Sequence, residues 1–238
     1  RRGGIGRPNH GIGRARCNGA VPHRCASRGG EHELFSHSSR YGRRPYAYRQ
    51  GIWLGRGVAM PADPIRLTLP LDPEEAKELR AGQACLLSGP LFTLRDAGHQ
   101  RLLAEMGDGK ELPYGLTGQT IFYAGPTPSA AGRPFGAIGP TTASRMDFAA
   151  PHLMDCGLAA TVGKGHRSEA VRQACIDNGA VYFVAVGGAA AFLAKCIESC
   201  ETLAYDDLGT EALRKIIVSD FPVFVGIDTM GEDIYSLD

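Results

Sequence analysis

Long apolar runs are missing from this 238-residue sequence, and its first residues hold no apolar segment of the kind found in a secretory signal. The longest weakly polar stretch, residues 180–194, is interrupted by the Gly187-Gly188 pair. A membrane-spanning helix needs about 20 consecutive apolar residues, so this stretch suits a strand, turn and helix better. The hydrophobic content of 43% is sufficient for a real core. We therefore expect a soluble, cytoplasmic protein without a membrane-spanning helix.

Paired cysteines of the CxxC type are also absent. The seven Cys stand at positions 17, 25, 85, 156, 175, 196 and 200, an odd number with no regular spacing. This pattern argues against a disulfide framework and favours a reducing compartment. Cys196 and Cys200 lie about one helical turn apart, but two thiols do not complete a four-ligand site. We expect this chain to bind no metal, and Cys156, Cys175 and Cys196 to pack as small hydrophobic side chains.

Lysine is absent from the first 59 residues, which hold 12 Arg and two acids. Their net charge of +10 leaves −9 for residues 60–238. The basic segment has neither helical nor strand periodicity and few apolar residues, so we expect it to be disordered. It could be a nucleic-acid-binding arm, an organelle transit peptide, or translated upstream sequence before a true start at Met60. We favour the last interpretation, because ordinary composition begins at Met60, and consider nucleic-acid binding the weakest of the three.

The remainder, residues 60–238, has the alternating strand and helix patterns of one folded domain. Strands are expected over residues 65–71, 84–88, 91–94, 118–124, 158–162, 181–186, 216–218, 223–228 and 234–237. Helices are expected over residues 72–79, 96–106, 140–153, 168–178 and 189–200. This alternation, with glycines after several strands, predicts an α/β domain that binds ligands at its strand ends.

Three of the predicted strand-to-helix junctions carry cations or hydroxyl groups. They are Arg95, the segment Gly139–Arg145 and the loop Gly163–Gly165. A helix N-terminus offers unpaired N–H groups and a positive dipole, so such junctions favour anions. Neither a Walker-type motif nor GxGxxG occurs in the folded part, which weakens a nucleotide-binding interpretation. These patterns by themselves indicate an anion-binding α/β domain.

Within these junctions, Thr141 and Arg145 have the i, i+4 spacing that would place both on one helix face. Arg95 and Arg145 can each hold a carboxylate through two hydrogen bonds, whereas Lys164 is a point charge on a flexible stem. Three cations suit a ligand with two carboxylates. Isolated arginines at helix starts are, however, often only solvated or salt-bridged surface groups.

Seven segments together resemble one known family. They are LSGPLFTLRDAGH (87–99), IFYAGPTP (121–128), GPTTASRMD (139–147), GKG (163–165), GAVYFVAVGGAAAFLAK (179–195), DLGTEAL (207–213) and DFPVFVGIDTMGEDIY (220–235). In this order they are similar to the β subunit of the iron–sulfur-dependent class I fumarate hydratase and L-tartrate dehydratase family. GPTT-x-x-RM, combined with RDxxH and GKG, is the most specific part of the resemblance.

The resemblance implies a swivelling β/β/α layered domain that works with an α subunit or an N-terminal domain. That partner would carry a [4Fe–4S] cluster, so this chain alone should be inactive and part of a hetero-oligomer. The implied reaction is the reversible hydration of fumarate to L-malate, a step of the tricarboxylic acid cycle. Conversion of L-tartrate to oxaloacetate is the alternative, and a non-catalytic anion-binding module is another. Fumarate is preferred because GTEAL and AVYFVAVGGAAA look closer to the fumarase type.

The resemblance also implies roles for single residues. Arg95, Arg145 and Lys164 would anchor the substrate carboxylates, and Thr141 would be the base that moves the proton beside a carboxylate. Thr142 would support this site. His99, four residues after Arg95, would either orient Arg95 through a hydrogen bond or transfer a proton itself, and we favour the first.

Overall fold

A computed structural model describes residues 63–107, 111–127 and 136–237 of the chain. The expectations for residues 1–59 lie outside these ranges. Within them, no helix combines the length and apolar character needed to cross a membrane.

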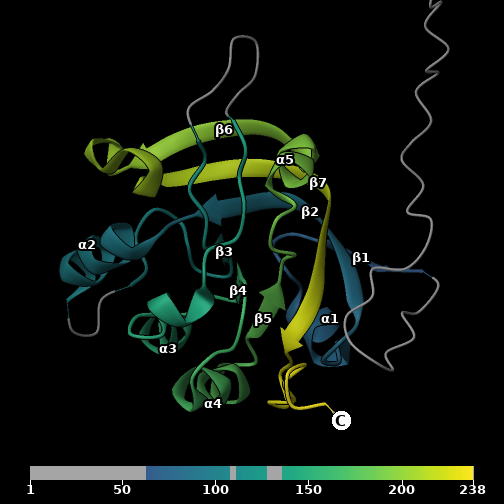
Figure 1. The fold of residues 1–238 in the computed structure, drawn as a ribbon. Helices are drawn as coiled ribbons and strands as arrows, with labels where there is room; N and C mark the ends of the chain where they lie inside the picture. Colours follow the sequence, from purple (N-terminus) through teal and green to yellow (C-terminus); the bar gives the residue numbers. More distant parts are fainter. Residues whose placement is uncertain (1–62, 108–110, 128–135, 238) are drawn as a thin grey trace, which may run out of the picture. The chain divides into compact units, whose positions relative to one another are not determined.

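Seven strands pair in the described part, and five of them close into a barrel (Figure 1). The strands are β1 (Ile65–Thr68), β2 (Ala84–Thr93), β3 (Thr120–Phe122), β4 (Ala160–Gly163), β5 (Val181–Val184), β6 (Ile197–Ala204) and β7 (Leu213–Ile227). β2, β3, β4 and β5 form a parallel row, and β7 pairs antiparallel with both β2 and β5. β1 is added to β2, and β6 to β7. The predicted α/β class is confirmed, whereas barrel closure was not predicted.

Two strands are longer than their sequence patterns suggested. β7 is continuous over 15 residues and joins the two predicted strands 216–218 and 223–228. β2 likewise continues through the Gly-Pro pair, with a register shift against β7 between Leu87 and Gly89, where Gly89 has φ 123°. A bulge of this kind bends a strand and increases its twist, which suits the wall of a barrel. The predicted strand 234–237 does not form, although Ile234 N–H donates to the Gly226 carbonyl of β7.

The core has two parts because successive strand residues point to opposite faces. On β3, Phe122 belongs to a cluster with Leu87, Leu91 and Phe183, while its neighbour Ile121 belongs to the other. The first cluster combines strand residues with residues of the helices α1 and α5, and the second packs strand residues against α2, α3 and α4. Each fully buried side chain of this size contributes about 1.5–3 kcal/mol through its removal from water.

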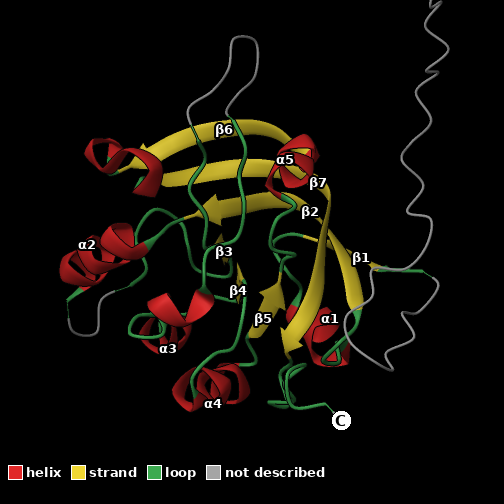
Figure 2. Ribbon diagram, viewed as in Figure 1, coloured by secondary structure: helices red, strands yellow, loops and turns green. Residues whose placement is uncertain are grey.

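The described part has five α-helices and three 3₁₀ turns, and local sequence signals account for α1, α2 and α4. The helices are α1 (Pro73–Glu78), α2 (Asp96–Met106), α3 (Ala150–Asp155), α4 (Glu169–Asn178) and α5 (Ala190–Leu193), with 3₁₀ turns η1 (Ala143–Met146), η2 (Ala194–Cys196) and η3 (Asp206–Glu211). Asp72 accepts from the Glu74 and Glu75 N–H groups at 2.8 and 3.2 Å and so caps α1. Gly179 ends α4 in the left-handed conformation that glycine favours. The predictions of α1, α2 and α4 are confirmed, and Figure 2 shows α2, α3 and α4 along one side of the barrel.

The predicted helix over residues 189–200 is wrong in its second half. Helical structure ends at Cys196, and residues 197–204 instead form β6 on the free edge of β7. Apolar and polar residues suit either structure over so short a range, and the available edge of β7 decides in favour of the strand.

The predicted helix over residues 140–153 is also wrong, since only η1 and α3 are helical there. Thr141 N–H donates to the Tyr123 carbonyl at 2.7 Å, and Ala143 N–H donates to the Lys164 carbonyl at 2.8 Å. The first part of this segment therefore hydrogen-bonds to residues that follow β3 and β4. Its N–H groups are not available for a regular helix, which begins only after these residues.

Gly98→Ala is expected to destabilise the domain although alanine is the better helix former. A Cβ at Gly98 would lie 2.4 Å from Leu94 Cδ1 and 2.7 Å from the Glu211 carbonyl oxygen. This clash should outweigh the gain of about 1 kcal/mol in helix propensity. Urea denaturation should show a loss of about 1–3 kcal/mol. The exposed Gln100→Ala on the same helix is the control and should change stability by less than about 0.5 kcal/mol. An equally stable Gly98→Ala variant would contradict the close packing of α2.

Candidate functional site

The candidate site lies where the parallel strands end. Arg95 follows β2 by two residues, Lys164 follows β4 directly, and Gly187 follows β5 by three. Because β2, β3, β4 and β5 are parallel, their carboxyl ends meet at one edge of the barrel, the usual position of ligand sites in open α/β sheets. We call Arg95, Arg145 and Lys164 the cationic rim.

The backbone joins two of the predicted junctions directly. Lys164 N–H donates to the Thr141 carbonyl at 3.1 Å, and Thr142 and Lys164 form a parallel β-bridge. Gly163 makes this approach possible, since a Cβ there would lie only 2.8 Å from Ala143 Cβ. Thr141 and Lys164, 23 positions apart in sequence, are thus held side by side.

Arg145 approaches Thr141 from the 3₁₀ turn η1. Its Nη1 lies 3.4 Å from Thr141 Oγ1, and its Nε donates to Asp96 Oδ1 at 2.9 Å. The predicted pairing of Thr141 with Arg145 therefore occurs, but the predicted α-helical face is not its cause. A bridge followed by a tight turn brings the two side chains together.

Arg95 is the residue before α2, and two carboxylates accompany it. Its Nε lies 4.0 Å from Asp96 Oδ2, and its Nη2 lies 3.7 Å from Glu211 Oε1. The other oxygen of Glu211 accepts from Ala97 N–H at 2.7 Å and so caps α2 from a distant part of the chain. Gly125 leaves room for the arginine, because a Cβ there would lie 3.0 Å from Arg95 Cδ.

Asp96 therefore has a different role from a helix cap. One of its oxygens accepts from Arg145, and the other faces Arg95. Sequence spacing gave no sign that Asp96 and Glu211 would lie between the cations. Both are three-quarters buried as side chains, so these contacts are screened less than surface ion pairs.

Lys164 is the third member of the cationic rim. It is exposed, and its stem passes close to Gly187, whose Cβ would lie 3.6 Å from Lys164 Cδ. Among the described residues, no carboxylate lies within ion-pair distance of its amino group. An exposed ammonium on a flexible stem can reach an anion that enters from solvent.

His99 lies behind Arg95 and is fully buried. Its Nδ1 is 2.8 Å from the Arg95 carbonyl oxygen, and its ring meets Tyr123 edge-on at a centroid distance of 5.3 Å. Burial lowers the pKa of His99 to about 4, because the charged imidazole cannot be hydrated there. A neutral ring must donate from Nδ1 to the carbonyl, so His99 holds the backbone of Arg95 and does not contact its guanidinium, which lies beside Asp96 and Glu211.

Sequence patterns also missed a buried arginine three residues after Lys164. The Arg167 side chain has no exposed surface, and its Nε donates to Asp147 Oδ1 at 2.6 Å. Asp147 lies within a segment of the family resemblance and Arg167 just after one, but nothing in their spacing predicts that they pair.

The cysteines of the described part show no arrangement for metal binding. No group of three or more His, Cys, Asp or Glu residues in this part could hold a metal ion. Burial raises the pKa of Cys85 and Cys175 to about 12, which disfavours the thiolate that binds metals. Cys175 packs in the second core cluster, Cys156 contacts the same cluster, and Cys196 contacts the first core cluster. The described residues therefore do not fit an iron–sulfur cluster.

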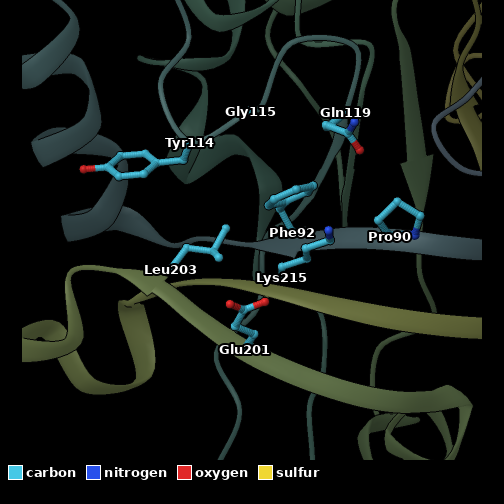
Figure 3. Close-up of a pocket in the computed structure, with 8 residues that line it drawn as sticks. All are labelled: Pro90, Phe92, Tyr114, Gly115, Gln119, Glu201, Leu203 and Lys215. Carbon is cyan, nitrogen blue, oxygen red and sulfur yellow. The ribbon is translucent and has the colours of Figure 1, made fainter.

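A separate pocket lies on the wall formed by β2, β6 and β7 (Figure 3). Its volume is about 260 Å³. The lining residues are Pro90, Phe92, Tyr114, Gly115, Gln119, Glu201, Leu203 and Lys215. No member of the cationic rim lines this pocket, so the two features are distinct.

His99→Asn is expected to make the fold less sensitive to acid. The unfolded imidazole has a pKa near 6.5 and the folded one about 4, so the unfolded state binds more protons between these values. The free energy of unfolding must therefore fall as the pH falls from about 6.5 to about 4. Asparagine keeps an N–H donor near the Arg95 carbonyl and does not titrate. Denaturant unfolding at pH 7 and pH 4.5 measures how much free energy of unfolding is lost on acidification. This loss should be about 2–3 kcal/mol smaller in the variant than in the wild type. Equal losses would contradict a neutral His99.

Comparison with known proteins agrees with the resemblance seen in the sequence. The family model described as the fumarase C-terminus matches residues 55–237. Fumarate hydratase 2 of Leishmania major is 38% identical over 176 residues, which cover 72% of this chain and 31% of the relative. The anaerobic class I fumarate hydratase of Escherichia coli is 42% identical over 151 residues, covering 63% and 28%. A Methanocaldococcus jannaschii protein provisionally named L(+)-tartrate dehydratase subunit beta is 32% identical over 171 residues, covering 69% and 88%.

The coverage defines which part of such proteins this chain represents. It spans about a third of the length of the fumarate hydratases, but most of the tartrate dehydratase subunit. The chain therefore belongs to the fumarase C-terminal family, as a homologue of the C-terminal region of class I fumarate hydratases and of the tartrate dehydratase β subunit.

Proposed function

We propose that this chain is the substrate-anchoring component of a hydro-lyase that reversibly hydrates fumarate to L-malate. The observation that carries the proposal is the cationic rim itself, with the Thr141 hydroxyl 3.4 Å from the Arg145 guanidinium. The family membership supports hydro-lyase chemistry. L-tartrate dehydration is the second candidate, because the chain covers 88% of a relative with that name.

The two carboxylates of the proposed substrate need cationic partners at two positions in the site. Arg145 uses Nε for Asp96, and its Nη2 has no hydrogen-bond partner among the described residues, so an incoming carboxylate can bind at the terminal nitrogens. Arg95 and Lys164 supply the remaining cations for the same or the second carboxylate. Asp96 and Glu211 orient the two arginines before the substrate arrives, which reduces the ordering cost of binding.

Thr141 is the proposed proton acceptor. When L-malate loses water, the proton at the carbon beside a carboxylate leaves with negative charge building on that group. Arginine and lysine side chains already in place stabilise this charge in the transition state. Arg145 also donates to the Thr141 oxygen, which helps that oxygen to carry negative charge. Thr142 supports the arrangement through its backbone bridge with Lys164.

We propose that a partner chain carries the [4Fe–4S] cluster and completes the active site. The described residues of this chain do not fit the cluster, and one relative is named as a subunit. Cytoplasmic assembly into a hetero-oligomer, with this domain swivelling against its partner, completes the proposal.

Arg145→Lys is expected to lower kcat/KM for L-malate by about 10- to 100-fold, because a charge-assisted pair of hydrogen bonds is worth about 1.5–3 kcal/mol. The measurement uses the chain co-expressed anaerobically with a cluster-bearing α subunit, with fumarate, L-malate and L-tartrate as substrates. Arg101→Lys is the matched control, since Arg101 of α2 donates two hydrogen bonds to Asp207 of η3 and lies outside the cationic rim.

Three results would change this proposal. Turnover of L-tartrate without fumarate or L-malate would favour the second candidate. A reconstituted complex that turns over none of the three would overturn hydro-lyase function. Wild-type kinetics in the Arg145→Lys variant would exclude the proposed role of the Arg145 guanidinium in substrate binding.

Thr141→Val should lower kcat by about 100- to 10,000-fold with a smaller change in KM, because the proton acceptor is lost while the cations remain. Thr141→Ser keeps the hydroxyl and should retain most activity. Comparable activity of the valine and wild-type complexes would exclude Thr141 as the proton acceptor.

A further inference from the structure

The buried Arg167 belongs to the loop that carries Lys164 but cannot itself reach a substrate. Its side chain has no exposed surface, and it donates to Asp147 Oδ1 at 2.6 Å. Its Nη1 also lies 3.2 Å from Thr161 Oγ1 on β4. Since a buried cation without partners is strongly unfavourable, this set of contacts holds the guanidinium in one place.

Two tyrosines complete the surroundings of this guanidinium. The Arg167 Cζ lies 5.3 Å from the ring centroid of Tyr123 and 4.8 Å from that of Tyr182, within cation–π distance. Tyr123 follows β3, and Tyr182 lies on β5. Arg167 therefore connects neighbouring barrel strands to the loop after β4.

Asp147 connects the same centre to the segment that carries Thr141 and Arg145. Its second oxygen accepts from Ser168 N–H at 2.7 Å, so both oxygens hold the 164–168 loop. Asp147 itself stands two residues after Arg145. The two loops are consequently tied at one end by the bridge of Thr142 with Lys164 and at the other by Asp147.

Tyr182 adds a third connection to the Lys164 loop. Its hydroxyl donates to the Gly165 carbonyl at 2.8 Å, directly after Lys164. Gly165 has φ 83°, a conformation that glycine adopts readily and that this hydrogen bond helps to hold.

We propose that Arg167, Asp147 and Tyr182 are positioning residues that fix the separation of Lys164 from Arg145. The inference rests on the proposed function, and within it takes Arg145 and Lys164 to bind the two different carboxylates of one substrate. Fixing the two backbone segments limits how far from Arg145 the flexible Lys164 stem can place its ammonium, so the site selects dicarboxylates by length and favours the four-carbon spacing over a longer one. These three residues act through the cationic rim and do not touch the substrate.

Tyr182→Phe is the mildest test, because it removes one hydroxyl and keeps the ring beside Arg167. Inhibition of the reconstituted complex by succinate and by glutarate measures the preference for four over five carbons. The inhibition constant of glutarate divided by that of succinate should fall by about fivefold, which is the effect expected for the loss of one hydrogen bond. Tyr205→Phe is the matched control, since the Tyr205 hydroxyl also makes a short bond, 2.7 Å to Glu105, but contacts neither loop. It should keep the wild-type ratio.

The double variant Arg167→Met/Asp147→Asn removes both charges together, so neither is left buried alone. The asparagine side chain introduced by the second substitution retains an acceptor for the Ser168 N–H group. This variant should assemble with its partner, lose the preference between succinate and glutarate, and show kcat about 100-fold lower. Arg167→Lys keeps the charge without the planar donor set and should retain the length preference only in part.

The outcomes separate this inference from the proposed function. A wild-type complex that neither turns over nor binds dicarboxylates would overturn the proposed function. An active wild-type complex, combined with wild-type length preference in Tyr182→Phe and in a folded double variant, would overturn the positioning role alone. If the double variant does not fold, Tyr182→Phe against Tyr205→Phe decides the question.

Discussion

Pairing of β7 with both β2 and β5 is the constraint on which the rest of the domain depends. β2, β3, β4 and β5 alone would form an open parallel row with two free edges. β7 is long enough to pair with both outer strands, and it closes the row into a barrel. Closure buries one apolar face inside the ring and leaves the other for α2, α3 and α4. It also brings the carboxyl ends of four parallel strands to one edge.

That edge is shaped by close backbone contact more than by long side chains. Gly163 allows the segment around Ala143 to lie against β4, and Gly125 leaves room for Arg95. Two arginines and two carboxylates then lie together, with Asp96 contacting Arg145 and facing Arg95, and with Glu211 also facing Arg95. Behind them, His99 and Arg167 are buried and held by the backbone, aromatic rings and Asp147. A rigid support of this kind suits a site that must bind a charged ligand without rearranging.

Much of this domain could be predicted from the sequence. The α/β class and the positions of α1, α2 and α4 follow from local signals, namely the Asp72 cap, apolar periodicity and the Gly179 stop. The family follows from short motifs in a fixed order, and the family model confirms it. The same motifs contain Arg95, Thr141, Arg145 and Lys164, whose roles remain predictions although the fold brings Thr141 into contact with both Arg145 and Lys164.

The sequence by itself therefore determined the class, the family and the chemical groups, because each is encoded by neighbouring residues. Only the tertiary structure decided that residues 197–204 form a strand, since the free edge of β7 supplies the hydrogen bonds. It also decided that Glu211 caps α2 and that Asp147 neutralises Arg167. The first contact joins two residues that are 114 positions apart in the sequence, and the second joins two that are 20 positions apart. Local periodicity carries no information about such pairs, because they form only when the folded sheet brings together the segments that connect its strands.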